Sequence, residues 1–160
     1  MEKGAFTYVA LGLLVWAISS SLVAGYYINQ YNVYYREYSD LANMLDSVSI
    51  RVNILLGYGN DTKIWHNNTV LPLNSTAFTA AEAIADIEYT DYGGELGVLI
   101  TSMNGVANNE TCGWLYWHWD TAKPMWIIPE YSSAKFLLHR DDTIAFTYVE
   151  YATWPPATPT

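Results

Sequence analysis

The segment from Gly4 to Tyr35 limits what this chain can fold into more than any other, because it contains no charged residue. Its most apolar part, roughly Ala5 to Ile28, is long enough as an α-helix to cross the ~30 Å hydrocarbon core of a bilayer. A cleaved signal peptide is the alternative, and Leu22-Val23-Ala24 offers a small-residue cleavage site. The apolar run is long for a signal, however, and its basic flank is only Lys3 beside Glu2. We expect a retained helix that is either a membrane anchor or the core of an assembly.

Past the apolar part, the pattern changes from uniformly apolar to a single stripe. Tyrosines crowd this end of the helix, as in the aromatic belt of a membrane interface. The stripe residues lie alternately three and four positions apart, which is the spacing of a coiled-coil seam. They are Tyr31, Tyr34, Tyr38, Leu41 and Leu45. The seam predicts a helix to about Asp46, so that residues 1–46 form one region, and it favours packing against copies of the same chain.

Residues 47–152 predict a small β-rich domain. Alternating apolar residues from Val48 to Leu56 end at the turn cluster Gly57 to Asp61, which is typical of a strand followed by a hairpin. Further strands are expected at 63–67, 69–73, 96–103, 114–119 and 125–128, with alternating patterns at 134–138 and 144–150. The fold class is α+β, a long apolar helix followed by a small antiparallel β-rich domain.

Three local signals complete this outline. Ser75-Thr76 is a helix cap before an apolar pattern that runs to Tyr89, which predicts one helix in the domain. Asn104-Gly105 is a strong tight-turn pair. Residues 153–160 form a Pro/Thr tail of polyproline character, which we expect to be solvated and open to O-glycosylation.

Composition excludes several classes of function. The chain has 7 Lys plus Arg against 16 Asp plus Glu, a net charge of -9, and no basic cluster, so nucleic acid is not an expected partner. Cys112 is the single cysteine, which rules out an intrachain disulfide. The histidines, at positions 66, 118 and 139, lack metal-ligand spacing. No phosphate loop, nucleophile elbow or carboxylate pair is present. We expect no catalytic residue, no cofactor and no metal site.

Four Asn-x-Ser/Thr sequons indicate that the domain faces the outside of a cell. Three of them follow one another at seven-residue spacing in a stretch rich in turn formers. Their asparagines are Asn60, Asn67, Asn74 and Asn109. N-glycosylation of these residues would place the domain outside and the N-terminus of the helix inside.

An aromatic cluster is the main remaining signal for a binding surface. It consists of Trp114, Tyr116, Trp117, Trp119 and Trp126. Because successive side chains of a strand point to opposite faces, one half of these rings would join the core and the other half would be exposed. Exposed rings mark a protein interface or a ligand platform. The alternative is that other parts of the domain cover them.

Several short motifs resemble the transcobalamin C-terminal-like domain. They are Gly113-Trp114-Leu115-Tyr116, the run from Ala134 to Leu138 and the run from Asp141 to Tyr148. The resemblance covers roughly residues 47–152 and implies a β-grasp-like domain. Arg140-Asp141-Asp142 departs from that family's Asp-Gly-Asp turn. In transcobalamin a second, helical domain completes the corrinoid site; no such domain is expected here, and corrinoid binding is not carried over.

The order of helix and domain is similar to that of archaeal surface proteins of unknown function and to the plan of type IV pilins. The seam and this resemblance favour a structural subunit of a glycosylated cell-surface filament or assembly, with the helices bundled as its core and the β domain outward. Its partners would be copies of itself, the membrane and covalent N-glycans. The alternative is a single-pass, membrane-anchored extracellular binding module, or an accessory subunit of a membrane complex, that holds a ligand or partner on the aromatic strand.

Overall fold

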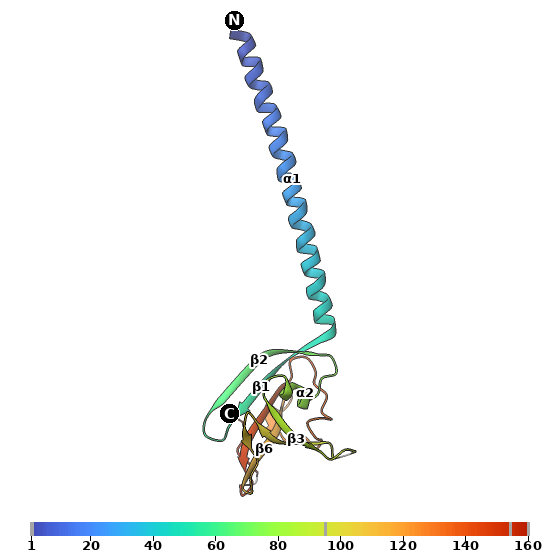
Figure 1. Cartoon of the computed structure of the whole chain (residues 1–160), viewed down its shortest axis with the longest axis vertical. Helices are drawn as coiled ribbons and strands as arrows, with labels where there is room; N and C mark the ends of the chain where they lie inside the picture. Colours follow the sequence, from blue (N-terminus) through green and yellow to red (C-terminus); the bar gives the residue numbers. More distant parts are fainter. Residues whose placement is uncertain (1, 95, 154, 160) are drawn as a thin grey trace. The chain divides into compact units, whose positions relative to one another are not determined.

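A computed structural model describes residues 2–94, 96–153 and 155–159, with side chains from Thr7 onward. The chain divides into two compact units, Met1–Ser47 and Val48–Thr160, and Figure 1 shows the helical and the β-rich unit. The first unit is formed by the helix α1 (Glu2–Val48), which ends where the apolar stripe gives way to the alternating pattern of the first strand.

The second unit is built on a five-stranded sheet in the order β2-β1-β8-β6-β7. The strands are β1 (Ser49–Gly57), β2 (Lys63–Pro72), β6 (Cys112–Asp120), β7 (Met125–Ile127) and β8 (Thr143–Glu150). The α+β class is confirmed. The sheet is mixed rather than wholly antiparallel, because β1 and β8 pair in parallel while the other pairs of this sheet are antiparallel.

One strand, β2, replaces the two short return strands expected from the sequence. The register against β1 shifts between Val52 and Ile54, so a bulge takes up the residues between the two halves. Asn68, at this bulge, has a φ of 54°, and its N–H donates a hydrogen bond to Asn53 Oδ1 at 3.1 Å. Asparagine tolerates this left-handed backbone better than most residues. The bulge therefore keeps one continuous strand in contact with β1.

A second sheet of three strands has the order β3-β4-β5, and its strands are β3 (Ile87–Asp91), β4 (Val98–Met103) and β5 (Val106–Ala107). β4 and β5 are joined by the expected Asn104-Gly105 turn, in which both residues have positive φ, 50° and 79°. The pattern at 134–138 forms no strand of its own, and Leu137 pairs only through an isolated bridge to Thr76.

The predicted helix is much shorter than its apolar pattern. α2 covers only Ala77–Glu82, and the prediction that it runs to Tyr89 is wrong. Ile87 and Tyr89 satisfy a strand period as well as a helical one, and pairing with β4 decides between them. The ring of Tyr89 packs edge-on against Phe78 of α2, with centroids 4.9 Å apart.

The five-stranded sheet is buried on both faces near its centre. One face forms the main core with α2 and β4. Its buried side chains include Ile50, Val52, Ile54, Leu56, Phe78, Ile100, Met103, Ile144 and Phe146. The opposite face carries a smaller buried cluster of Leu55, Trp117 and Ala145. The alternation of each strand thus supplies two apolar layers instead of one apolar and one polar face.

Candidate functional site

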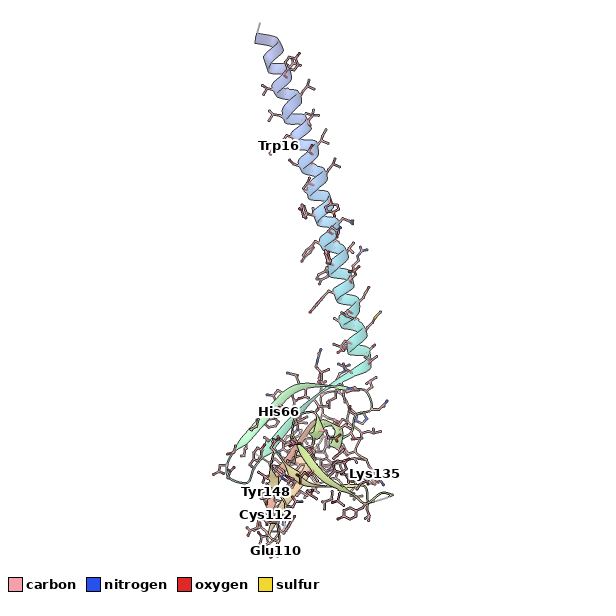
Figure 2. The ribbon with its side chains drawn as sticks, in the orientation of Figure 1. Trp16, His66, Glu110, Cys112, Lys135 and Tyr148 are labelled. Atoms are coloured by element: carbon pink, nitrogen blue, oxygen red, sulfur yellow. The ribbon has the colours of Figure 1, made fainter. Side chains whose placement is uncertain are left out.

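The stripe on α1 is exposed to solvent within this chain. Figure 2 shows side chains projecting from the helix along its length, with Trp16 labelled. The five stripe residues, Tyr31, Tyr34, Tyr38, Leu41 and Leu45, are between 56% and 75% exposed. The helix is long and apolar enough to cross a membrane, and none of its most apolar window is buried by the rest of the chain. Its apolar surface thus lacks a cover within the described residues.

The serines in the apolar part of α1 satisfy their hydroxyl groups within the helix. Ser19, Ser20 and Ser21 each donate to the carbonyl oxygen four residues earlier, at 2.8 to 2.9 Å. An unpaired hydroxyl would be costly in an apolar environment, whereas these are already paired. The serine triplet is therefore compatible with insertion into lipid or with packing inside a helix bundle.

The aromatic residues of β6 divide between the two buried layers. Trp114 is 7% exposed and belongs to the main core. Tyr116 is partly buried and packs against the same core. Trp117 is 3% exposed and lies in the cluster on the opposite face. The expectation that one side of this strand presents its rings to solvent is corrected for Trp114 and Trp117, because both layers of the sheet are covered.

Trp117 is fixed by a hydrogen bond as well as by packing. Its indole Nε1–H donates to Thr147 Oγ1 of β8 at 2.7 Å, and the pair is buried. An indole N–H needs such a partner when it is removed from water. The bond links two neighbouring strands on this face of the sheet.

Trp119 and Trp126 are the partly exposed tryptophans of the aromatic cluster. They lie directly opposite each other on β6 and β7, and their rings meet edge to face with centroids 5.3 Å apart. We call the tryptophan face the side of the sheet formed by Leu55, Leu115, Trp117, Trp119, Trp126, Ala145 and Thr147.

The C-terminal tail lies over part of the tryptophan face. Pro159 lines one pocket together with Thr147 and a second pocket together with Trp119 and Trp126. Pro156 and Pro159 are buried, which corrects the expectation of a wholly solvated tail for these two residues. Two residues of the expected tail, Trp154 and Thr160, lie outside the described residues. The tail therefore belongs to the packing of the second unit.

A cavity of about 270 Å³ lies between the two sheets. Tyr116 and Trp114 line it from β6, and Ile100 lines it from β4. The Tyr116 hydroxyl is buried and has no hydrogen-bond partner among the described residues. Burial, and secondarily the charge of Asp142, raises the pKa of this phenol well above its ordinary value. The cavity wall is mixed, because Glu130, Ser132 and Ser133 line it beside the apolar residues.

Two histidines flank Asp142, an arrangement that the sequence spacing does not reveal. His118 Nε2 lies 3.6 Å from one carboxylate oxygen, and His139 Nδ1 lies 3.6 Å from the other. The backbone N–H of His139 also donates to Asp142 at 2.7 Å. Among the described residues, no group of three or more His, Cys, Asp and Glu side chains has the geometry of a metal site. The bond from the backbone N–H of His139 to the Asp142 carboxylate closes the turn before β8.

The four sequon asparagines all have exposed side chains. Asn60 accepts a hydrogen bond from the backbone of Thr62 at 3.2 Å. Asn109 has more contacts, because its Oδ1 accepts bonds from the backbone of Thr111 and Cys112 while its Nδ2 donates to Tyr148 Oη at 3.0 Å. Cys112 and Tyr148 are labelled close together in Figure 2. Each of the four asparagine side chains is accessible to solvent. The side chain of Asn109 is the one held by the most hydrogen bonds.

Comparisons with known proteins support the fold and not a family assignment. No known family profile matches the sequence, and no curated protein sequence matches it. Among solved structures, the chain is similar to haptocorrin in complex with Cbi, at 12% identity and a TM-score of 0.50, over 64% of this chain and 25% of haptocorrin. The chain thus spans about a quarter of haptocorrin's length.

A second solved structure is a candidate metal binding protein from Ruminococcus gnavus, at 14% identity and a TM-score of 0.45, over 63% of this chain and 97% of that protein. At these identities the likeness concerns the fold alone. The haptocorrin match agrees with the resemblance to transcobalamin-type domains seen in the motifs of β6 and β8.

Proposed function

We propose that this protein is a structural subunit of a cell-surface assembly, in which α1 anchors the chain and packs against α1 of other copies while the β-rich unit is displayed outward. The observation that supports this proposal is the exposed stripe on α1. A simple tether needs an apolar span, but it does not need a regular seam of five large side chains beyond that span.

The exposed helix also argues for a cover supplied from outside the chain. Burial of apolar surface is worth roughly 25 cal/mol per Å², so the large side chains that project from α1 favour lipid or neighbouring helices over water. The apolar part suits a bilayer or a helix bundle, and the stripe that follows it suits a bundle of helices. The apolar part of α1 and the stripe would both be covered if the helices of several copies associated side by side.

The four exposed sequon asparagines support an outward orientation of the β-rich unit. Every one of them lies in the second unit, and none is in α1. We propose that Asn60, Asn67, Asn74 and Asn109 carry N-glycans. Mass spectrometry of glycopeptides from the native protein tests this part of the proposal, and four unmodified asparagines would remove it.

Electron microscopy of material sheared from the source cells tests the assembly directly. We expect filaments or regular particles in which mass spectrometry identifies this chain as the main component. Recovery of the chain only as a monomer in the membrane fraction would contradict self-assembly and favour a single-pass anchor.

Substitutions on the stripe test the interface in purified protein. Tyr38→Glu, Leu41→Glu and Leu45→Glu together should abolish assembly, because they would bring buried like charges together between helices. A matched control places three glutamates on the opposite side of the same helix, at Asn32, Ser39 and Asn43. This control should assemble like the wild type, and equal assembly of both variants would exclude the seam as the contact.

A membrane-anchored binding module is the second candidate function. The observation that favours it is the cavity between the two sheets, one of whose lining residues, Tyr116, has a buried hydroxyl with no partner among the described residues. Such a group would be satisfied by a small ligand with a hydrogen-bonding atom. A ligand found by thermal-shift screening should lose affinity in Tyr116→Phe without any change in oligomeric state.

A further inference from the structure

Within residues 155–159 of the C-terminal tail, two prolines three positions apart are buried, whereas Thr153, three positions before the first of them, is exposed. Pro156 and Pro159 are buried, whereas Ala157 and Thr158 between them are exposed. Pro155, before them, is exposed as well. A polyproline II helix has three residues per turn, so residues three apart lie on the same side. The spacing of the two buried prolines corresponds to one turn of a polyproline II helix with one side against the domain.

The sequence of this segment has the spacing that aromatic grooves recognise. Pro156-Ala157-Thr158-Pro159 places two prolines three residues apart. Proline fixes its own φ, so such a segment loses little conformational entropy when it docks. Aromatic side chains supply flat apolar walls for the two proline rings.

The tryptophan face supplies walls of this kind. The pocket formed by Trp119, Pro124, Met125 and Trp126 also contains Thr158 and Pro159. On the other side, Pro159 lines a pocket with Thr147 and with Gly57 at the end of β1. Pro159 therefore lies between the Trp119 and Trp126 pair and the end of β1 with the turn that follows it.

The tail is held mainly by these side-chain contacts. The last backbone hydrogen bond before it runs from the N–H of Tyr151 to the carbonyl of Thr111 at 2.8 Å. Among residues 155–159, no hydrogen bond to the sheet is present. Residues 155–159 can therefore leave the tryptophan face without breaking the hydrogen bonds between strands. In this respect the tail is bound like a separate peptide ligand.

We infer that the tryptophan face is a binding site for extended proline-rich segments and that the chain's own tail is its resident ligand. This inference does not depend on the proposed function. A tethered segment acts at an effective concentration on the order of millimolar. A free segment of the same chemistry therefore binds weakly while the tail is in place and binds well once the tail is absent.

The first test keeps the full chain, in detergent micelles, and measures hydroxyl-radical oxidation of individual tryptophans by mass spectrometry. Pro156→Ala combined with Pro159→Ala should raise the oxidation of Trp119 and Trp126 several-fold, because the segment would no longer cover them. Pro155→Ala is the matched control, since that proline is exposed, and it should leave both tryptophans at the wild-type level. Unchanged oxidation in the double variant would overturn the inference.

The second test supplies the tail as a separate molecule. A fluorescent peptide of residues 155–160, PPATPT, should bind saturably to a chain shortened to end at Thr153 and at least tenfold more weakly to the full chain. The peptide PAATAT, which lacks the two buried prolines, should not bind. Equal binding of both peptides, or no binding to the shortened chain with an intact circular dichroism spectrum, would contradict a proline-specific site.

Discussion

At the scale of single residues, the large aromatic side chains of β6 have different environments although they follow one another in the chain. Trp114 fills the main core, Trp117 fills the opposite layer through its bond to Thr147, and Trp119 lies at the partly exposed edge. Tyr116 differs from all of these, because its hydroxyl is buried beside a cavity without a partner among the described residues. Replacing Tyr116 with phenylalanine removes only this hydroxyl and therefore measures what it contributes to stability.

Tyr116→Phe should leave the free energy of unfolding unchanged or raise it by up to about 1 kcal/mol, because it removes a buried polar group that has no partner. Urea unfolding measures the change, and Tyr131→Phe, at an exposed tyrosine, is the control. A loss of more than about 1 kcal/mol would mean that the hydroxyl is hydrogen bonded in solution, by water or by a ligand in the cavity.

The same substitution has a predicted pH dependence. The raised pKa keeps the phenol neutral in the folded state, whereas the unfolded state begins to lose this proton near pH 10.0. Stability from this group is therefore complete below pH 10.0 and declines above it. The wild type should lose stability more steeply than Tyr116→Phe over that alkaline range, and parallel curves would contradict the shift.

At the scale of elements, α2 is short and depends on its N-terminal cap. Thr76 Oγ1 accepts a hydrogen bond from the backbone N–H of Thr79 at 3.2 Å, and Thr79 Oγ1 accepts one from the backbone N–H of Thr76 at 2.8 Å. Thr76 is also the third residue of the sequon at Asn74. The hydroxyl that caps α2 is therefore also the one on which the proposed glycosylation of Asn74 would depend.

Thr76→Ala should lower the free energy of unfolding by about 1 kcal/mol, even in protein that carries no glycan, because the cap is lost. Thr76→Ser keeps a capping hydroxyl and should retain most of the stability. Thermal unfolding of protein produced in bacteria separates the cap from the glycan. Equal melting temperatures for the alanine and serine variants would show that the cap contributes little.

At the scale of the whole molecule, the two units have opposite relations to solvent. The described side chains of α1 are almost entirely exposed, and many of them are large apolar groups, whereas the unit from Val48 to Thr160 has two buried layers of its own. Lipid or other chains would supply the cover of α1 in the proposed function, whereas the β-rich unit has buried layers of its own.

A chain that begins at Val48 should be monomeric in buffer and unfold cooperatively, because both cores of the second unit remain complete. Size-exclusion chromatography and near-ultraviolet circular dichroism measure these properties. The full chain should require detergent under the same conditions. A shortened chain without near-ultraviolet signal would show that the β-rich unit depends on α1.

Local pattern was sufficient to predict several elements of this fold. The apolar run and its stripe predicted a helix to about Asp46, and α1 ends at Val48. Alternation of apolar residues predicted β1 and β8. Asn104-Gly105 predicted the turn between β4 and β5, because asparagine and glycine both tolerate the positive φ values that this turn requires. These signals depend only on neighbouring residues, so the elements can be predicted without knowing how the rest of the chain folds.

Other features depended on partners distant in sequence. The segment Ile87–Asp91 fits a helix by its own pattern and became a strand because β4 pairs with it. Alternation of β6 separated its rings into two sets, but only the second apolar layer showed that Trp117 is buried. Likewise, Pro159 looks like part of a solvated tail until Trp119 and Trp126 of the folded domain are present beside it.

The sequence by itself therefore determined the division into a long helix with an uncharged apolar segment and a β-rich domain, because charge and periodicity are properties of neighbouring positions. The tertiary structure alone decided the parallel pairing of β1 with β8, the second buried layer and the position of the tail beside Trp119 and Trp126. Each of these contacts joins residues far apart in the chain, and its free energy is gained only when the completed sheet brings both partners together.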